Sequence, residues 1–456
     1  MTTLIRKGML VLPSGVMEGD ILAEEGRIRR IAPHMEAAAD TVLEAEGCYV
    51  FPGFIDTHTH FDLELPATVT ADNFPTGTRA AVAGGTTTVL DFATQDRGMT
   101  MRQALEKWHK KARGSSCHYG FHMAVSEWNE ARMDEVQAMI DGGVTSFKMY
   151  MVYDNMKVDD GRMYEAVKFL KDRDCIVGVH CENDAIIQAR VRELHRAGKL
   201  APIYHARSRP DLVESDGVAR LMDICALAGA PAWVVHLSTG AGLAEARKAR
   251  RRGQEVYLES CPQYLVLEEK EYLAADAEKF IMSPPLRSPE DQEALLQAMG
   301  QGELDWIGTD HCSFTMAQKA MGGGDFSKVP NGGAGVQNRA EIVYTRGVRG
   351  GYITIEQMSR LLSENAARLF GMYPKKGVLM EGSDADIVIF DPNCPHEIHA
   401  ATNLHHCDNS PYEGYAAAGK TRDVLLKGVP VVRDGRVVLE GQGEYVFRGP
   451  CQRYRK

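Results

Sequence analysis

Short apolar runs that alternate with helical patterns fill the middle of the chain, and this alternation restricts the possible fold more than any other feature. Eight runs have the length of a buried strand: residues 50–56, 86–92, 118–125, 144–151, 175–180, 233–237, 255–259 and 306–309. Helical periodicity separates most of them, for example in residues 102–111, 133–140, 241–252 and 289–299. Eight strand and helix units within about 320 residues predict a (β/α)8 (TIM) barrel.

The two ends of the chain have a different pattern, in which short β-branched segments are broken by turn residues. A chain of 456 residues also exceeds the ~250 to 300 residues at which single hydrophobic cores stop growing. We therefore predict two domains: a barrel of residues 51–374 and a discontinuous β-sandwich domain made of residues 1–50 and 375–456.

The composition excludes several classes of protein. A net charge of −10 without long basic runs predicts no positively charged surface that would bind nucleic acid or anionic lipid. No apolar stretch reaches the ~18 residues that a membrane helix requires, and residues 1–23 do not resemble a secretory signal. The ten cysteines form no Cys-x-x-Cys pair, which argues against a zinc ribbon or a disulfide scaffold. We expect a soluble, cytoplasmic protein.

Residue types that bind metals occur at the carboxyl end of five of the eight runs, where a barrel of this kind has its active site. One histidine at the end of a buried strand is usually structural, whereas the same placement on five strands predicts a metal centre. The lysine among them is notable because it lies within an otherwise apolar run. The candidate ligands are His58, His60, Lys148, His180, His236 and Asp310.

The segments that contain these residues resemble the metal motifs of the cyclic amidohydrolases, namely residues 58–60, 146–148, 180–183, 235–238 and 308–312. Three further segments are similar to the dihydropyrimidinase and D-hydantoinase branch: Ser-Cys-Pro-Gln-Tyr at 260–264, Ser-Pro-Pro-Leu-Arg at 283–287 and Pro-Asn-Gly-Gly at 330–333. The resemblance covers nearly the whole chain. The set of motifs is specific, although no single motif is.

This resemblance implies a binuclear zinc centre, with two Zn2+ per subunit bridged by an N6-carboxylated Lys148. His58, His60 and Asp310 would hold one ion, and His180 and His236 the other. The chemistry suits the sequence, because an amine in an apolar strand has a lowered pKa and its neutral form can react with carbon dioxide.

The implied reaction is the hydrolysis of a cyclic amide by hydroxide that bridges the two ions, which lower the pKa of a bound water. Asp310 would take a proton as general base and return it to the ring nitrogen as general acid. In the family, a tyrosine five residues after the carboxylated lysine stabilises the oxyanion, and Tyr153 occupies that position. Main-chain groups at Ser283 and Asn331 would hold the ring.

The loops after the first and fourth runs would surround the substituent on the ring, and their side chains are mostly apolar: Phe61, Leu63, Leu65, Met151, Tyr153 and Met156. This favours hydantoins with aromatic or aliphatic 5-substituents over unsubstituted dihydrouracil. The alternative is that these side chains only pack the loops.

Three alternatives to a hydantoinase or dihydropyrimidinase were weighed. Dihydroorotases usually have an arginine two residues after the second histidine, where this chain has Asp62, which would repel an anionic substrate. Allantoinase stays open, although the segments around Ser283 and Asn331 count against it. The same fold also serves as a tubulin-associated scaffold that has lost its metal ligands, whereas all six ligand positions are filled here.

Two features beyond the active site stay open in the sequence. The resemblance implies a homotetramer, and nothing in the residues alone tests that expectation. The tail of residues 445–456 is either a subunit contact or a disordered end.

Overall fold

The largest feature of the computed structural model, which describes residues 1–454, is a sheet of eight parallel strands in chain order. The strands are β6 (Phe54–Thr59), β7 (Thr86–Gln95), β8 (His118–Val125), β9 (Ser146–Tyr150), β10 (Ile176–His180), β11 (Ala232–Val234), β12 (Val256–Ser260) and β13 (Trp306–Ile307). Each strand overlaps one of the eight apolar runs. The predicted barrel is therefore confirmed.

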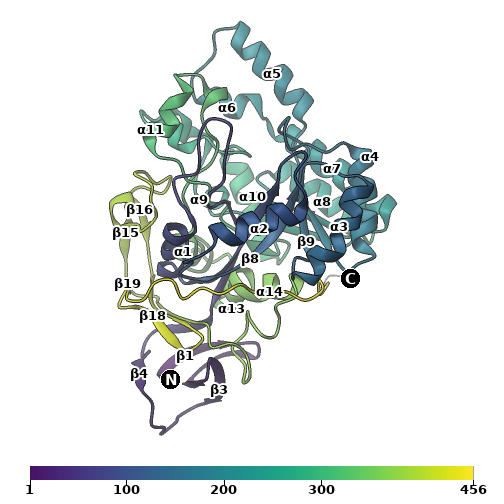
Figure 1. Cartoon of the computed structure of the whole chain (residues 1–456). Helices are drawn as coiled ribbons and strands as arrows, with labels where there is room; N and C mark the ends of the chain where they lie inside the picture. The colour runs from purple at the N-terminus through teal and green to yellow at the C-terminus, as the bar shows by residue number, and fades with distance from the viewer. Residues whose placement is uncertain (455–456) are drawn as a thin grey trace.

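Helices connect these strands and cover the outside of the sheet (Figure 1). The helices of eight residues or more are α1 (Phe74–Ala83), α2 (Met101–Lys111), α3 (Glu130–Asp141), α4 (Asp160–Lys171), α5 (Asp184–Arg196), α7 (Asp211–Ala228), α8 (Gly240–Arg251) and α10 (Pro289–Gly300). Shorter α-helices are α6 (Ile203–Ser208), α9 (Gln263–Val266), α11 (Met316–Lys319), α12 (Arg339–Ile342), α13 (Ile355–Ser359) and α14 (Asn365–Leu369). The four helical stretches named from the sequence correspond to α2, α3, α8 and α10.

Local sequence explains where most of the longer helices begin. Seven of them follow a residue whose side chain accepts a hydrogen bond from a backbone amide of the first turn: Asn73, Thr100, Asn129, Asp159, Asn183, Thr239 and Ser288. In α2 the buried side chains are Met101, Ala104, Leu105 and Trp108, which lie on one face because they recur at helical spacing. The last turn of α8 carries Lys248, Arg250 and Arg251, where basic side chains interact favourably with the helix dipole.

The barrel closes where β13 approaches β6. The backbone amide of His60 donates to the carbonyl oxygen of His311 at 2.8 Å. The buried guanidinium of Arg339 donates to the carbonyl oxygens of Ile55, at 2.7 Å, and Ile307, at 3.0 Å, and so joins the two strands. This closure brings the carboxyl end of the first strand beside that of the last.

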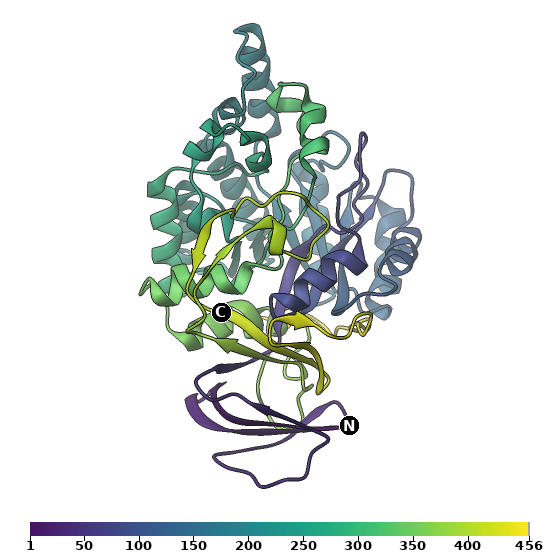
Figure 2. The same cartoon turned by 90° about the vertical axis from the view of Figure 1, so that its left-hand side faces the viewer.

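The two ends of the chain meet in a separate nine-stranded sheet (Figure 2). Its strands are β1 (Thr2–Leu12), β2 (Gly15–Glu24), β3 (Arg27–Ala32), β4 (Thr41–Glu44), β5 (Tyr49–Pro52), β14 (Ile387–Asp391), β17 (Lys420–Leu426), β18 (Val429–Arg433) and β19 (Arg436–Val437). The antiparallel pair of β5 and β14 joins the N-terminal and C-terminal parts. The expected discontinuous β domain is thus present, as one continuous sheet, and a small sheet of β15 (His396–Ile398) and β16 (Tyr415–Ala417) accompanies it.

The first predicted strand is divided between the two sheets. Phe51 and Pro52 pair with β14 in the nine-stranded sheet, whereas the barrel strand begins at Phe54. Gly53 separates them, and a Cβ atom there would lie 2.1 Å from the side chain of Thr87, so the chain can pass only with glycine at this position. The expectation that residue 51 already belongs to the barrel is wrong in this respect; the other domain boundaries stay predictions.

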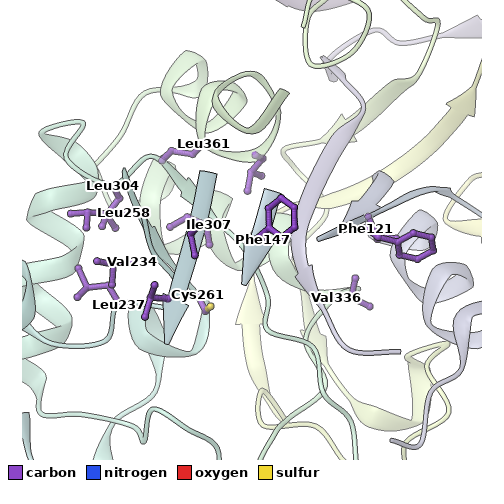
Figure 3. Close-up of a cluster of buried hydrophobic side chains, with 14 of the residues drawn as sticks. Phe121, Phe147, Val234, Leu237, Leu258, Cys261, Leu304, Ile307, Val336 and Leu361 are labelled. Atoms are coloured by element: carbon purple, nitrogen blue, oxygen red, sulfur yellow. The ribbon is translucent and has the colours of Figure 1, made fainter. Parts of the chain in front are cut away.

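Two apolar cores flank the barrel wall. One lies between the strands and the surrounding helices, and Figure 3 shows part of it around Val234, Leu258 and Ile307. The other fills the amino-terminal end of the barrel, where the rings of Trp233, Trp306 and Phe370 have centroids 5.1 to 5.8 Å apart. Because that end is packed with side chains, only the carboxyl-terminal end can hold a substrate.

The tail packs against the barrel of its own chain as far as it is described. The backbone amide of Val446 donates to Tyr119, and that of Cys451 donates to Asp174. The buried guanidinium of Arg448 donates to the hydroxyl of Ser146 at 2.8 Å. Residues 445–454 are therefore ordered by contacts within the chain, and residues 455–456 lie outside the described part.

No helix between residues 1 and 454 has the length and apolar character needed to cross a membrane.

Candidate active site

A cavity of about 480 Å3 opens at the carboxyl-terminal end of the barrel strands. It is lined by twelve of the fourteen residues that the sequence selected: His58, His60, Leu63, Leu65, Lys148, Tyr153, Met156, His180, His236, Ser283, Asp310 and Asn331. The six candidate metal ligands thus come together from five different strands, as expected from their places at the strand ends.

Asp310 lies at the centre of the histidine cluster. Its Oδ1 atom is 3.2 Å from Nε2 of His58 and 3.1 Å from Nε2 of His60. Single ligand atoms of His58, His236 and Asp310 all lie within 4.8 Å of one another. Asp310 and His236 both have left-handed backbone, with φ of 52° and 39°, a strained conformation that is common where a side chain must be aimed into a site.

Glu259 orients the ring of His58. Its Oε1 atom lies 2.5 Å from Nδ1 of His58, and its carboxylate also accepts hydrogen bonds from Nε1 of Trp306, at 2.9 Å, and from the backbone amide of His236, at 3.1 Å. Burial lowers the pKa of His58 well below its usual value, although Asp310 acts in the opposite direction. With Nδ1 engaged by Glu259, Nε2 is left as the metal-binding atom.

Glu182 holds His180 in a similar way. Its Oε2 atom lies 2.6 Å from Nε2 of His180 and accepts a hydrogen bond from Arg209 at 2.7 Å. Burial lowers the pKa of His180 although Glu182 acts in the opposite direction. In His236, Nδ1 is buried and has no hydrogen-bond partner among residues 1–454. Both rings therefore keep one nitrogen available for a metal.

Lys148 has the environment that carboxylation requires. Its side chain is 1% exposed, and its Nζ atom has no hydrogen-bond partner in the described part of the chain. Burial lowers the pKa of this amine to about 8, although Glu259 and Asp310 act in the opposite direction. A buried, unpaired amine is costly unless it is modified or neutral. The unpartnered amine of Lys148 and the unpartnered Nδ1 of His236 therefore fit a site in which a lysine carbamate would bridge two metal ions.

Three further polar side chains line the same cavity. The hydroxyl of Ser283 and the amide oxygen of Asn331 are buried without a partner among residues 1–454. Tyr153 has left-handed backbone, with φ of 72°, and its ring lies 5.4 Å from that of His180. Unpartnered polar atoms in a cavity indicate that a bound polar ligand supplies their hydrogen-bond partners.

Phe61 was expected in the wall of the substrate pocket, and its position is different. The side chain is fully buried and packs on Phe74, with ring centroids 5.5 Å apart, and on His311, at 5.4 Å. The strand β6 ends at Thr59 and the chain turns at Phe61, so that His60 lines the cavity while Phe61 packs away from it. Met151 also lies outside the cavity, whereas Met156 lines it.

Asp62 does not face the cavity either. Its Oδ2 atom accepts a hydrogen bond from the backbone amide of Phe74 at 3.1 Å, beside the start of α1. The predicted repulsion of an anionic substrate by this carboxylate is therefore not supported by its position.

The sequence interpretation missed the residues that orient the ligands, above all Glu182, Arg209 and Glu259. The available signal was the position of each carboxylate: Glu259 ends an apolar strand, and Glu182 follows His180 by two residues. A carboxylate buried in an apolar segment must have a polar partner, but the sequence does not say which one.

Residues 49–431 match the amidohydrolase family. The chain is 40% identical to a D-hydantoinase of Geobacillus stearothermophilus over 98% of this chain and 97% of that protein. It is 39% identical to a D-phenylhydantoinase of Escherichia coli O1:K1 over 99% of both chains. Among solved structures, a dihydropyrimidinase from Brevibacillus agri NCHU1002 superposes with a TM-score of 0.97, at 38% identity over 100% of both chains. An L-hydantoinase from Arthrobacter aurescens superposes with a TM-score of 0.89, at 28% identity, over 98% of this chain and 99% of that one.

Proposed function

The chain belongs to the amidohydrolase family, and we propose that it hydrolyses the cyclic amide bond of 5-substituted hydantoins, of dihydropyrimidines, or of both, to N-carbamoyl amino acids. The observation that carries this proposal is the cavity of about 480 Å3 itself, which is lined both by six residues of metal-binding types and by two unpartnered polar groups. A small ring rich in N-H and C=O groups suits such a cavity.

Two zinc ions are the proposed cofactor. His58, His60 and Asp310 would hold one ion, His180 and His236 the other, and carboxylated Lys148 would bridge them. When bound, the ions would supply a water of lowered pKa and polarise the ring carbonyl.

Asp310 is the proposed general base and acid. Burial raises the pKa of its carboxyl group, but the neighbouring His58 and His60 outweigh that effect and hold the pKa below its usual value. The carboxylate is therefore ionised at neutral pH and able to accept a proton from the attacking water. It would then return the proton to the ring nitrogen as the carbon–nitrogen bond breaks.

Tyr153 is the proposed donor to the oxyanion. Burial raises the pKa of its phenol, so the hydroxyl keeps its proton and can donate a hydrogen bond to the ring oxygen as negative charge develops there. Main-chain groups at Ser283 and Asn331 would pair with the N-H and C=O groups of the ring.

Leu63, Leu65 and Met156 are the proposed contacts of the 5-substituent, since they are apolar residues that line the cavity. Turnover of 5-phenylhydantoin, dihydrouracil and allantoin by the purified enzyme tests the assignment, with bound zinc measured in the same preparation. We expect the phenyl-substituted ring to be the best substrate. Faster opening of dihydrouracil would reverse the preference, and faster opening of allantoin would favour an allantoinase.

The same experiment tests the scaffold alternative, because a preparation that holds no zinc and opens none of the three rings would contradict an enzyme. The cytoplasmic location and the homotetramer stay proposals that rest on the family resemblance. Mass measurement of the native protein in solution tests the second of them.

A further inference from the structure

Lys319 is a buried lysine that the proposed reaction does not use. It ends α11, and its side chain is 1% exposed. Its Nζ atom donates hydrogen bonds to three backbone carbonyl oxygens, those of Ile281 at 2.8 Å, Pro330 at 2.7 Å and Gly332 at 2.6 Å. An ammonium group has three protons, so each of them is used.

These three carbonyl groups belong to the two segments that bring Ser283 and Asn331 to the cavity. Ile281 lies two residues before Ser283, and Pro330 and Gly332 flank Asn331. The segments also touch each other directly, because the backbone amide of Gly332 donates to the carbonyl oxygen of Ile281 at 3.0 Å. Lys319 therefore lies at the junction of the two segments proposed to hold the ring.

The electrostatic setting of Lys319 is unusual for a structural lysine. It forms no ion pair with any carboxylate of residues 1–454, and its Nζ atom lies 5.4 Å from the ring centroid of Phe314. Burial lowers the pKa of the amine to about 7, whereas carbonyl acceptors favour the charged form. Burial of a cation without a counter-ion costs free energy, and Lys319 gains no ion-pair energy in return. Its role is therefore to hold its three carbonyl acceptors in a fixed geometry.

We propose that Lys319 is a positioning residue for ring recognition: it sets the spacing between residues 281–283 and 330–332 at which their main chain holds the cyclic ureide. This inference rests on the proposed function. It assigns Lys319 no contact with the substrate and no part in proton transfer.

The test is Lys319→Met, which keeps the length of the side chain and removes all three donors. Because both segments contact the ring before and during the reaction, their displacement weakens ground-state and transition-state binding alike. We expect KM for 5-phenylhydantoin to rise about tenfold or more while kcat changes less than about threefold. Bound zinc should be unchanged. The ratio of kcat/KM between 5-phenylhydantoin and dihydrouracil should also be unchanged, since the ring is common to both.

Two further variants make the result decisive. Lys279→Met removes a neighbouring lysine that pairs with Asp276 at 2.7 Å and whose side chain forms no hydrogen bond with either segment among residues 1–454, so its KM should equal that of the wild type. Lys319→Gln keeps two N-H donors and should give an intermediate KM.

An unchanged KM in folded, zinc-loaded Lys319→Met would overturn the proposal. So would a fall in kcat and zinc with KM unchanged, which would indicate a general structural role. Failure of both Lys319 variants to fold would also count against it, because a role confined to two loops leaves the barrel intact. Failure of the wild-type enzyme to open any cyclic ureide would instead contradict the proposed function.

Discussion

At the scale of single residues, the candidate metal centre depends on carboxylates that lie behind the histidines. Glu259 engages Nδ1 of His58, and Glu182 engages Nε2 of His180, so each ring presents its other nitrogen to the cavity. Such partners fix the orientation and tautomer of a ligand histidine. The strength of the metal site should therefore depend on residues that never touch the metal.

Glu259→Gln tests this dependence. The amide keeps the size of the side chain but loses the charge that Nδ1–H of His58 faces, so zinc affinity or activity should fall about 10- to 100-fold. Zinc retained after dialysis against graded chelator measures the effect. The matched control is Glu255→Gln in the same segment, whose carboxylate accepts from the hydroxyl of Tyr257 at 2.5 Å, away from the metal residues. Equal zinc retention in the two variants would contradict the orienting role.

At the scale of elements, the loop between β6 and α1 determines one wall of the cavity. It carries Leu63 and Leu65, and it is tied to α2 through Glu64, whose carboxylate lies 2.8 Å from Nζ of Lys107 and 2.9 Å from Nζ of Lys111. Hydrogen bonding from Lys107 lowers the pKa of Glu64, so the pair is ionised at neutral pH. The position of the substituent pocket is therefore coupled to a surface helix.

Glu64→Gln should alter substrate preference more than stability. Exposed ion pairs contribute roughly 0.2 to 1 kcal/mol, so the free energy of unfolding should fall by less than about 1 kcal/mol. The looser loop should reduce the preference for 5-phenylhydantoin over dihydrouracil about two- to fivefold. The measurement is the ratio of kcat/KM for the two substrates. Glu245→Gln, which removes a surface ion pair of α8 with Lys248, is the control and should leave that ratio unchanged.

At the scale of the whole molecule, a buried ionic cluster joins the nine-stranded sheet to the barrel. Nζ of Lys376 lies 3.0 Å from Asp384 and is also hydrogen-bonded to Asp386, which in turn lies 3.4 Å from Nε2 of His118 at the start of β8. Burial raises the pKa of Asp386, but Lys376 outweighs it and holds the pKa below its usual value. The two domains are thus coupled through charge as well as through apolar contact.

Asp386→Asn should lower the free energy of unfolding by about 3 kcal/mol, because it leaves Lys376 with one carboxylate partner in a buried site. The folded pKa of Asp386 is depressed, so its contribution is present above the unfolded pKa of about 3.9 and is lost as the pH falls below it. The difference between wild type and variant should therefore be constant from about pH 5 to 8 and shrink below about pH 4.

Denaturant titration at several pH values measures this effect. Asp391→Asn, at the other end of β14, removes a partly buried carboxylate and is the control. If the difference in free energy of unfolding between the wild type and Asp386→Asn became larger as the pH falls, the pKa of Asp386 would not be depressed in the folded state.

Features that depend on neighbouring residues could be predicted from the sequence, whereas contacts between residues far apart in the chain could not. The eight strand runs, the caps of the helices and the ligand types at the strand ends follow from local periodicity and residue chemistry, which neighbouring residues carry by themselves. The family resemblance added the order in which the ligands would share two ions. Met156, Leu63 and Leu65 line the cavity, as their apolar character suggested.

The sequence by itself therefore determined the barrel and the rim at which the candidate ligands gather, and twelve of the fourteen residues that it selected line the cavity. Only the tertiary structure decided that Phe61 turns away, that Phe51 pairs with the other sheet, and that Lys319 lies beneath two loops. It also paired His58 with Glu259, which is 201 residues distant in the chain. The physical reason is that periodicity records which face of a strand is buried, whereas the partner that a buried group meets depends on how remote segments pack.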